Sequence, residues 1–330
     1  MLLQNFLITV SRLAHTLLFS FYKTCTVSRM DSKIRHGKVE LPVSTTNDNI
    51  TPGTEIVGNV RKCGDAVIAM YGINRGDTIA SLVGCGGNAK YINLDADQLV
   101  KVPRGVAAIS AAIVIESYLP AFQALLLRVP KTHRYTSSAL NGKGVLIFGG
   151  ITTVGQALIE LSLLLGASEV YTTATIKHHE LLESIGAIPL ELDPESWPQD
   201  INEKIDIAVD PSNFVVDKAS FKAINQDGKL VCFGTELEKN AAKFSTFSDL
   251  FDSKNMKMKT HMYNVFDEWK VDLEGSKSDL SYLFGLLKLT HIDPQLAGTL
   301  RLSKVPEAHI FLDGKKRIQG TFVCLPFAED

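Results

Sequence analysis

A run of glycines and threonines between an apolar strand and an apolar helix is the part of this sequence that could do chemistry. Residues 144–155 are GVLIFGGITTVG, and they lead into QALIELSLLLGA. A strand, a tight glycine turn and a helix N-terminus can cradle the diphosphate of a dinucleotide, because backbone N–H groups then face the anion. Gly150 and Gly155 fit the outer positions of G-x-G-x-x-G, but Thr152 stands at the middle one.

Thr152 and Thr153 leave two interpretations of this turn open. β-branched residues resist positive φ, and their methyl groups would approach the diphosphate. In one interpretation the diphosphate shifts and bonds to the threonine hydroxyls. In the other, cofactor binding is lost.

The end of the next predicted strand bears on the choice of cofactor. In NAD-binding proteins an acid about 20 residues after the glycine turn bonds the ribose 2′-hydroxyl. The segment YTTATIKHH has no acid, and Lys177 is placed to pair with a 2′-phosphate, so NADPH is favoured over NADH. The alternative is that Lys177 only opens the following helix in solvent, where most lysines lie.

Strands and helices alternate from about residue 144 onward, which predicts a doubly wound parallel sheet with helices on both faces. Ligands of such sheets bind beyond the carboxyl ends of the strands. The predicted cofactor-binding residues are therefore Gly149, Gly150, Thr152, Thr153, Val154, Gly155, Thr175, Lys177, Asp210 and Gly234. Residues 24–118 instead show short strands separated by glycine turns, which predicts a compact β-rich unit.

Composition narrows the class of protein. The chain has 330 residues, 45% of them hydrophobic and 21% charged, which suits about two globular domains. The formal net charge of −2 comes without a long block of one sign, so a small molecule is a better expected partner than nucleic acid. Five scattered cysteines without a C-x-x-C pair argue against a disulfide framework or a structural zinc site.

The first 23 residues contain no acid and have apolar residues at helical spacing. They are predicted to be a leader, for which a mitochondrial transit segment, a membrane anchor, a docking helix and a wrongly chosen start remain open. Polar residues interrupt the run, which weakens a membrane-spanning interpretation. The expected location is accordingly cytoplasmic or mitochondrial.

Several segments in order resemble the medium-chain dehydrogenase/reductase superfamily, in its zinc-free quinone oxidoreductase and vesicle amine transport protein-like branch. They are VSRMDSKIRHG, PGTEIVGNV, NRGDTIASL, ESYLPAFQALL, VLIFGGITTVGQAL, IDIAVDPS, DGKLVCFG and the closing IDPQLAGTLRLSKVPEAHIFLDGKKRIQGTFVCLP. The resemblance implies a GroES-like catalytic domain at 24–120 and 290–330 and a Rossmann cofactor domain at 121–289. Because relatives have several strands before the VSRMD-like segment, the first domain is expected to be N-terminally truncated, or its first strands to be replaced by the leader.

The resemblance also implies that the chain lacks catalytic zinc. Zinc-dependent members use a histidine in a Gly-His-Glu segment, and this chain has Thr54 between Gly53 and Glu55. Threonine cannot replace an imidazole ligand, and the eight histidines show no metal-ligand spacing.

Catalytic residues are carried over only in part. Ser28 and Asp31 align with a polar residue and an acid of the quinone oxidoreductase pattern, although Ser28 replaces the usual asparagine. A structural role for Asp31 is left equally open. Pro120 and Phe122 replace a threonine and a tyrosine of the linking helix, so Tyr71 and Tyr118 remain as hydroxyl-bearing candidates, and Tyr71 is the predicted catalytic one.

Two functions follow from these observations. The first is a zinc-independent NADPH-dependent oxidoreductase that reduces a quinone or an α,β-unsaturated carbonyl, expected to be a homodimer. The second is a non-catalytic scaffold of the same fold that acts through protein contacts, or through membrane contacts of its N-terminal segment.

Overall fold

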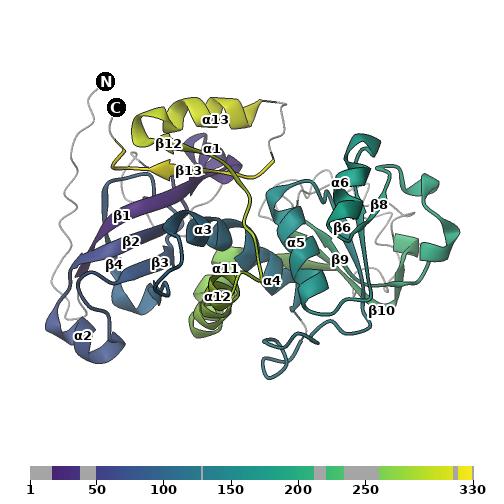
Figure 1. The fold of residues 1–330 in the computed structure, drawn as a ribbon, viewed down its shortest axis with the longest axis horizontal. Helices are drawn as coiled ribbons and strands as arrows, with labels where there is room; N and C mark the ends of the chain where they lie inside the picture. Colours follow the sequence, from purple (N-terminus) through teal and green to yellow (C-terminus); the bar gives the residue numbers. More distant parts are fainter. Residues whose placement is uncertain are drawn as a thin grey trace.

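Two units, each built on its own sheet, make up this computed structural model (Figure 1). The structure describes residues 17–37, 50–127, 129–211, 221–233, 260–314 and 319–328. The chain passes from the first unit to the second near residue 125 and returns near residue 290. The two expected layers, a β-rich unit and a doubly wound unit, are both present.

The first unit contains a mixed, mostly antiparallel sheet in the order β12-β13-β1-β2-β3-β5, with β4 paired to β1. Its strands are β1 (Leu17–Val27), β2 (Glu55–Lys62), β3 (Thr78–Leu82), β4 (Tyr91–Asp95), β5 (Val100–Lys101), β12 (Leu296–Arg301) and β13 (Thr321–Leu325). Strands β12 and β13 come from the end of the chain, so the closing segment returns to the first unit as the resemblance implied.

Strand β1 overlaps the segment that we predicted to be a leader. It begins at Leu17 and pairs antiparallel with β2 and β4 over residues 17–24. Residues 17–23 of the predicted leader thus belong to the first sheet, whereas residues 1–16 lie outside the described part of the chain.

The second unit is a parallel sheet in the order β11-β10-β9-β6-β7-β8. Its strands are β6 (Gly144–Phe148), β7 (Glu169–Thr173), β8 (Ile188–Leu190), β9 (Ile205–Asp210), β10 (Ile224–Phe233) and β11 (Thr260–Tyr263). The chain starts in the middle at β6, builds outward through β7 and β8, and then crosses to β9. This is the strand order of a dinucleotide-binding fold, and its switch point lies between β6 and β9.

Helices connect and cover the two sheets. They are α1 (Arg29–Arg35), α2 (Asp65–Tyr71), α3 (Ala108–Ile113), the π-helix η2 (Val114–Tyr118), α4 (Leu119–Leu125), α5 (Thr153–Leu164), α6 (His179–Ser184), α11 (Val265–Val271), α12 (Leu273–Lys288) and α13 (Val305–Asp313). Helix α5 packs against β6 and β7, and α13 packs against α1.

The continuous segment α3-η2-α4 joins the two units. Residues 108–125 are apolar and long enough to cross a membrane, but 78% of this window is buried inside the protein, as expected of a core helix. Phe122 and Leu119 within it are fully buried in the largest apolar cluster. The segment therefore acts as the central packing element against which α5 and α12 are placed.

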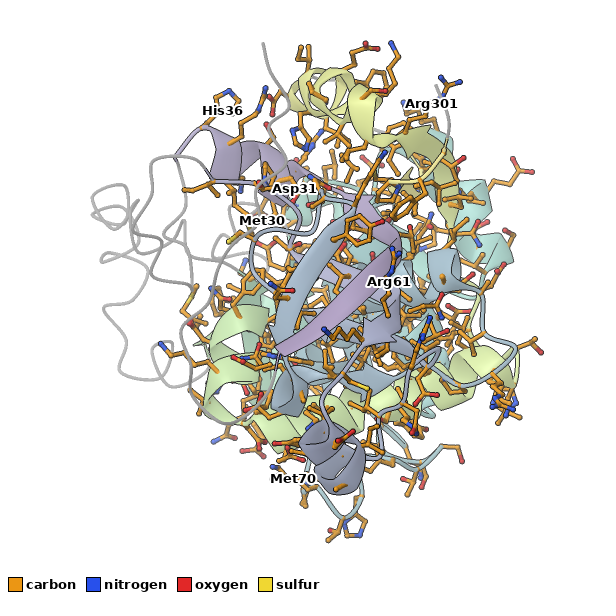
Figure 2. The ribbon with its side chains drawn as sticks, turned by 90° about the vertical axis from the view of Figure 1, so that its left-hand side faces the viewer. Met30, Asp31, His36, Arg61, Met70 and Arg301 are labelled. Carbon is orange, nitrogen blue, oxygen red and sulfur yellow. The ribbon has the colours of Figure 1, made fainter. Side chains whose placement is uncertain are left out.

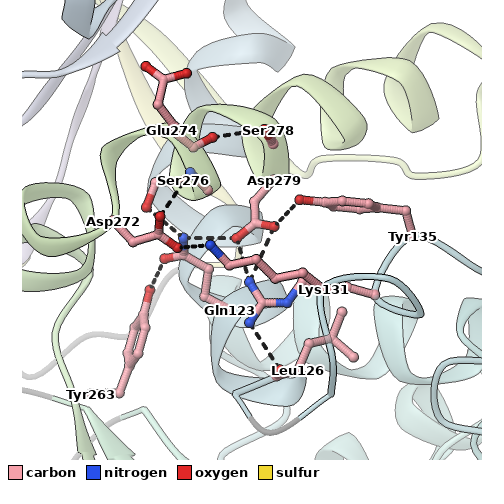
Figure 3. Close-up of polar contacts among 12 residues, drawn as sticks. Gln123, Leu126, Lys131, Tyr135, Tyr263, Asp272, Glu274, Ser276, Ser278 and Asp279 are labelled. Atoms are coloured by element: carbon pink, nitrogen blue, oxygen red, sulfur yellow. Dashed lines mark hydrogen bonds and ion pairs between the residues drawn. The ribbon is translucent and has the colours of Figure 1, made fainter.

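A buried polar network holds α12 on this central helix (Figure 3). Gln123 of α4 donates to both Ser276 and Asp279 of α12, at 3.1 Å each, and accepts a hydrogen bond of 2.7 Å from Tyr263. The Asp279 carboxylate also forms an ion pair of 3.1 Å with Arg134. Because these charges and amides are buried and paired, their network fixes the position of α12 relative to the linking helix.

Candidate functional site

The carboxyl ends of β6, β7 and β9 meet at one edge of the parallel sheet. The glycine turn follows β6, residues 174–177 follow β7, and Asp210 ends β9. The N–H of Gly149 donates to the Thr173 hydroxyl at 2.9 Å, which ties the turn to the end of β7. The structure therefore brings these predicted segments together, while Gly234 lies outside the described residues.

Thr152 does not meet the conflict that its type suggested. Its φ is −74° and its ψ 159°, so it adopts extended backbone, and the positive φ of the turn, +80°, falls on Gly149. Its hydroxyl accepts from the Gly155 N–H at 3.0 Å and donates to the Gly149 carbonyl at 2.9 Å. The side chain is thus the N-cap of α5, bonded within its own turn. The expectation of backbone strain at Thr152 was wrong, because another residue carries the left-handed conformation.

Gly150 and Gly155 are required by close packing. A Cβ built on Gly150 would collide with the Thr172 side chain of β7, and one built on Gly155 would collide with the Gly149 carbonyl. The outer glycines therefore let the strand, the turn and the helix approach one another.

The start of α5 keeps N–H groups free for a ligand. The first four N–H groups of a helix have no acceptor within the helix. In α5 the N–H of Gly155 bonds to the Thr152 hydroxyl and that of Gln156 to the Thr152 carbonyl at 2.8 Å. This leaves the N–H groups of Thr153 and Val154, and the first turn contains no acid. The geometry fits a diphosphate here, because anions bind at the positive end of a helix.

The remaining predicted cofactor residues lie at different depths. Thr175 and Lys177 are both exposed. Lys177 lies in the short 3₁₀ turn η3 (Ile176–His178), and Thr175 directly precedes that turn. Asp210 is buried at the end of β9. Lys177 has no ion pair within the described ranges, and no acid stands beside it at the end of β7, so it remains available to an external anion.

A small cavity separates the start of α5 from the linking helix. It is lined by Thr153 and Gln156 of α5, Ser117 and Tyr118 of η2, and by Ile113 and Gln295. Its volume is about 10 Å³, which is room for one water molecule. A nicotinamide ring could enter at this junction only if these side chains moved apart.

Tyr118 lines this cavity and donates its hydroxyl hydrogen to Glu160 of α5. Burial, together with the neighbouring Glu160 charge, raises the pKa of Tyr118 above its usual range, and the phenol stays protonated. Of the two hydroxyl-bearing candidates, Tyr118 is the one beside the glycine turn.

Ser28 and Asp31 form a closed capping arrangement at the start of α1. The Ser28 hydroxyl accepts from the Met30 N–H at 3.2 Å, and Asp31 accepts from the Ser28 N–H at 2.8 Å. The second Asp31 oxygen accepts from the Gly53 N–H at 2.8 Å. Because both carboxylate oxygens already bind backbone groups, the geometry assigns Asp31 a structural role first.

Asp31 belongs to a cluster of three buried carboxyl groups with Glu55 and Glu116. Burial, and secondly the charge of Glu55, raises the pKa of Asp31 to about 7. Burial also raises the pKa of Glu116 to about 7 and raises that of Glu55, although three hydrogen bonds from Thr26 and Thr54 oppose the shift at Glu55. Two of these groups thus titrate near neutral pH.

Sequence reasoning did not identify Glu116 as a member of this cluster. It lies in the π-helix η2 and accepts from the hydroxyls of Ser117 and Thr321. A signal was present, since Glu116 is the only charged residue between Arg104 and Arg128. A lone acid in an apolar helix is buried with it and titrates abnormally.

Tyr71 lies far from the other predicted catalytic residues. It ends α2, where 39% of its surface is exposed. Figure 2 shows its neighbour Met70 at one end of the first unit and Asp31 at the opposite end. The structure does not bring Tyr71 together with Ser28 and Asp31. Strands β1 and β2 are antiparallel, so α1, which follows β1, and α2, which follows β2, lie at opposite ends of this strand pair.

Thr54 occupies the position that a histidine holds in zinc-dependent relatives. Its hydroxyl donates to Glu55 at 2.7 Å and is satisfied within the first unit. Within the part of the chain that the structure describes, no three His, Cys, Asp or Glu side chains converge as metal ligands.

Comparison with known proteins agrees with this geometry. Residues 22–104 match the alcohol dehydrogenase GroES-like domain family. The chain is 29% identical over 216 residues to the chloroplastic NADPH-dependent alkenal/one oxidoreductase of Arabidopsis thaliana. The aligned residues cover 61% of this chain and 51% of that protein. The chain spans about half the length of the curated relatives it matches.

Solved structures share the whole architecture. The quinone oxidoreductase from Coxiella burnetii superposes with a TM-score of 0.72 at 19% identity, over 94% of this chain and 90% of that one. A mycobacterial protein complexed with NADPH gives 0.70 at 22% identity, over 94% and 91%. Residues 22–104 are thus similar to the alcohol dehydrogenase GroES-like family, and the chain as a whole shares the fold of these solved structures.

The family match and the strand order of the parallel sheet identify the two units. The first sheet is the GroES-like domain, and the parallel sheet with its glycine turn is the Rossmann domain. The candidate site is thus the junction between the start of α5, the π-helix and the α1 turn.

Proposed function

We propose that this chain is a zinc-independent, NADPH-dependent oxidoreductase that reduces a quinone or an α,β-unsaturated carbonyl. The observation that carries the proposal is the start of α5, where a relaxed turn leaves the N–H groups of Thr153 and Val154 directed away from the helix and without an acidic neighbour. The relative from Arabidopsis is an NADPH-dependent alkenal/one oxidoreductase, and a structural neighbour is complexed with NADPH.

Lys177 supports NADPH over NADH in this proposal. The residue is exposed at the carboxyl end of β7, on the strand that borders the glycine turn. In this fold the ribose of the cofactor lies over that strand end, so a cation there favours a 2′-phosphate. NADPH would supply a hydride to the substrate carbon, and the substrate oxygen would then need a proton.

We propose Tyr118 as the group that places this proton. Its hydroxyl lies at the junction between the glycine turn and the linking helix, and it is hydrogen-bonded to Glu160 of α5. Zinc independence rests on Thr54, which offers no imidazole at the family's ligand position. The predicted homodimer and cellular location stay predictions from the sequence.

Two observations favour the alternative, a non-catalytic scaffold. The junction between α5 and η2 holds only about 10 Å³, and the Asp31 oxygens are already bonded to backbone groups. If the chain does not bind a cofactor, the narrow cavity between α5 and η2 and the hydrogen bonds of Asp31 should persist in solution.

Titration of the purified full chain with NADPH and NADH, followed by nicotinamide fluorescence, separates the two functions. We expect saturable binding of NADPH, followed by NADPH oxidation with menadione or a 2-alkenal as the acceptor. Absence of saturable binding by either cofactor would refute the reductase and leave the scaffold.

The Lys177→Ala variant then tests the choice of cofactor. Removal of one charge-assisted contact is expected to raise the Kd for NADPH about tenfold and to leave that for NADH unchanged. Lys288→Ala, at the exposed end of α12, is the matched control and should change neither value. An unchanged preference in Lys177→Ala would reject this lysine as the 2′-phosphate partner.

A further inference from the structure

Two of the five cysteines lie opposite each other on adjacent strands of the GroES-like sheet. Cys25 of β1 and Cys324 of β13 are register partners in an antiparallel pair, and neither side chain has exposed surface. Directly opposed residues in such a pair have Cα atoms about 4.5–5.5 Å apart. This separation lies within the range of about 4.4–6.8 Å that a disulfide bridges, so the backbone need not move to join them.

The two thiols lie close to each other. The Cys25 thiol donates to the Asn88 side-chain oxygen at 3.2 Å, and the Cys324 thiol lies close enough to shift its pKa. The neighbouring Cys324, and secondly burial, hold the pKa of Cys25 well above its usual value. Little thiolate therefore forms in the closed protein, and reaction takes place when the β1–β13 pairing opens locally.

The other cysteines lack such a partner. Cys232 of β10 stands opposite Met262 and Asp210, and Cys63 donates to the carbonyl of Ile73 at 3.7 Å. Only the Cys25–Cys324 pair, among the described cysteines, combines facing register with a neighbouring thiol.

We propose that Cys25 and Cys324 are an oxidisable pair that a low-molecular-weight disulfide converts into a cross-strand disulfide. One protein thiolate attacks a sulfur of oxidised glutathione. This step forms a mixed disulfide between the protein and one glutathione, and it releases the other glutathione as a thiolate. The second protein thiolate attacks the protein sulfur of that intermediate and releases the glutathione bound there. Two electrons pass to the oxidant, and the two protons lost by the protein thiols are taken up by the released glutathione.

The bond would join the first and last described strands of the chain next to the candidate site. Cys25 is three residues before Ser28, and the Thr24 hydroxyl donates to the Cys324 carbonyl at 2.9 Å. A link at this point closes a very long loop, which is the case in which a disulfide restricts the unfolded chain most. Oxidation would thus link β1, the strand that precedes α1, covalently to β13.

The test uses the full chain in glutathione buffers of graded redox ratio, in one arm under native conditions and in a second at the denaturant midpoint, followed by return to native buffer. Free thiols are trapped by alkylation and linkages are mapped by non-reducing peptide mass spectrometry. We expect the Cys25–Cys324 peptide pair to be the main internal linkage, and the unfolding temperature to rise by roughly 5 °C, reversed by dithiothreitol. If the Cys25–Cys324 disulfide forms only in the second arm, the result supports a pair of thiols that can be joined but whose strands open slowly under native conditions.

Two variants control the experiment. Cys324→Ala should abolish both the linked peptides and the rise in unfolding temperature, whereas Cys232→Ala should keep both. If the second arm yields only free thiols, glutathione adducts, or random pairing with Cys63 and Cys85, the proposal is overturned.

Discussion

Helices α1 and α5 both begin with a hydroxyl side chain that caps the helix, yet only one of them is closed. In α1 the cap Ser28 is joined at the third helical position by Asp31, whose carboxyl oxygens accept hydrogen bonds from the N–H groups of Ser28 and Gly53. In α5 the cap Thr152 is followed by Gly155 at that position, and the first turn has no acid. The GroES-like terminus therefore satisfies itself, and the Rossmann terminus is left for an external anion.

This difference shows that a threonine in the glycine turn can bond within the turn and leave the start of the helix without a charged side chain. The Thr152 hydroxyl takes up one N–H, that of Gly155, and bonds nowhere outside the turn. What would close the site is a resident carboxyl group in the first turn, such as Asp31 provides in α1. Substitutions at either helix terminus test this difference.

The largest effect is expected from Gly150→Ala. Its new Cβ would overlap the Thr172 side chain of the neighbouring strand, so the variant should lose about 3 kcal/mol in its free energy of unfolding, together with any NADPH binding. Chemical denaturation measures the first and fluorescence titration the second. Gly285→Ala of α12, where a Cβ would meet no atom within 4 Å, is the control and should be as stable as the parent or more so. Equal stability of the two variants would contradict the packing argument.

Asp31→Asn should change the pH dependence of stability. Because the folded pKa of Asp31, about 7, lies above its unfolded value of 3.8, the folded state holds a proton that the unfolded state loses between about pH 4 and 7. The stability from this group is full below pH 4 and falls as the pH rises to 7, by on the order of 4 kcal/mol. The variant should lose that part of the decline in denaturation curves measured from pH 4 to 8.

Glu116→Gln serves as the comparison for Asp31→Asn, since the pKa of Glu116 is also raised to about 7 by burial. It should reduce the same slope without breaking the α1 cap. If neither variant flattens the decline, the two carboxyl groups ionise normally in the folded protein.

Thr153→Asp would place a carboxyl group in the first turn of α5, as α1 has one in its own first turn. An acid in the first turn should leave stability within about 1 kcal/mol of the parent but should repel a diphosphate, so the Kd for NADPH should rise at least about tenfold. Thr153→Asn has nearly the same shape without the charge and should bind NADPH far better than Thr153→Asp. Equal affinities would show that the diphosphate does not lie at the start of α5.

The smallest effect is expected from removal of the Thr152 cap. Thr152→Ala should cost about 1 kcal/mol of unfolding free energy, because the Gly155 N–H loses its acceptor, whereas Thr152→Ser keeps the hydroxyl and should be nearly neutral. Thermal and chemical denaturation of the pair give the difference. A similar loss in both variants would indicate that the threonine methyl group, and not its hydroxyl, stabilises the turn.

Much of the Rossmann domain could be predicted from local sequence. The strands VLIF and EVYTT are each followed by a turn and a helix, so their parallel pairing and the meeting of their carboxyl ends follow from chain geometry. The GroES-like domain was harder to predict. Strand β1 overlaps residues that looked like a leader, because strand pairing with the distant β2 and β4 overrides helical spacing of apolar residues.

The site divides in the same way. The sequence by itself determined that Gly150 and Gly155 flank a turn between a strand and a helix, and that Lys177 follows the next strand without an acid beside it. The tertiary structure alone decided that Gly149 carries the positive φ, that Thr152 bonds within its own turn, and that Tyr118 rather than Tyr71 lies beside it. Backbone dihedrals at a turn depend on the neighbouring strand, and contacts between residues far apart in the chain depend on packing, so neither can be obtained from residue type and spacing.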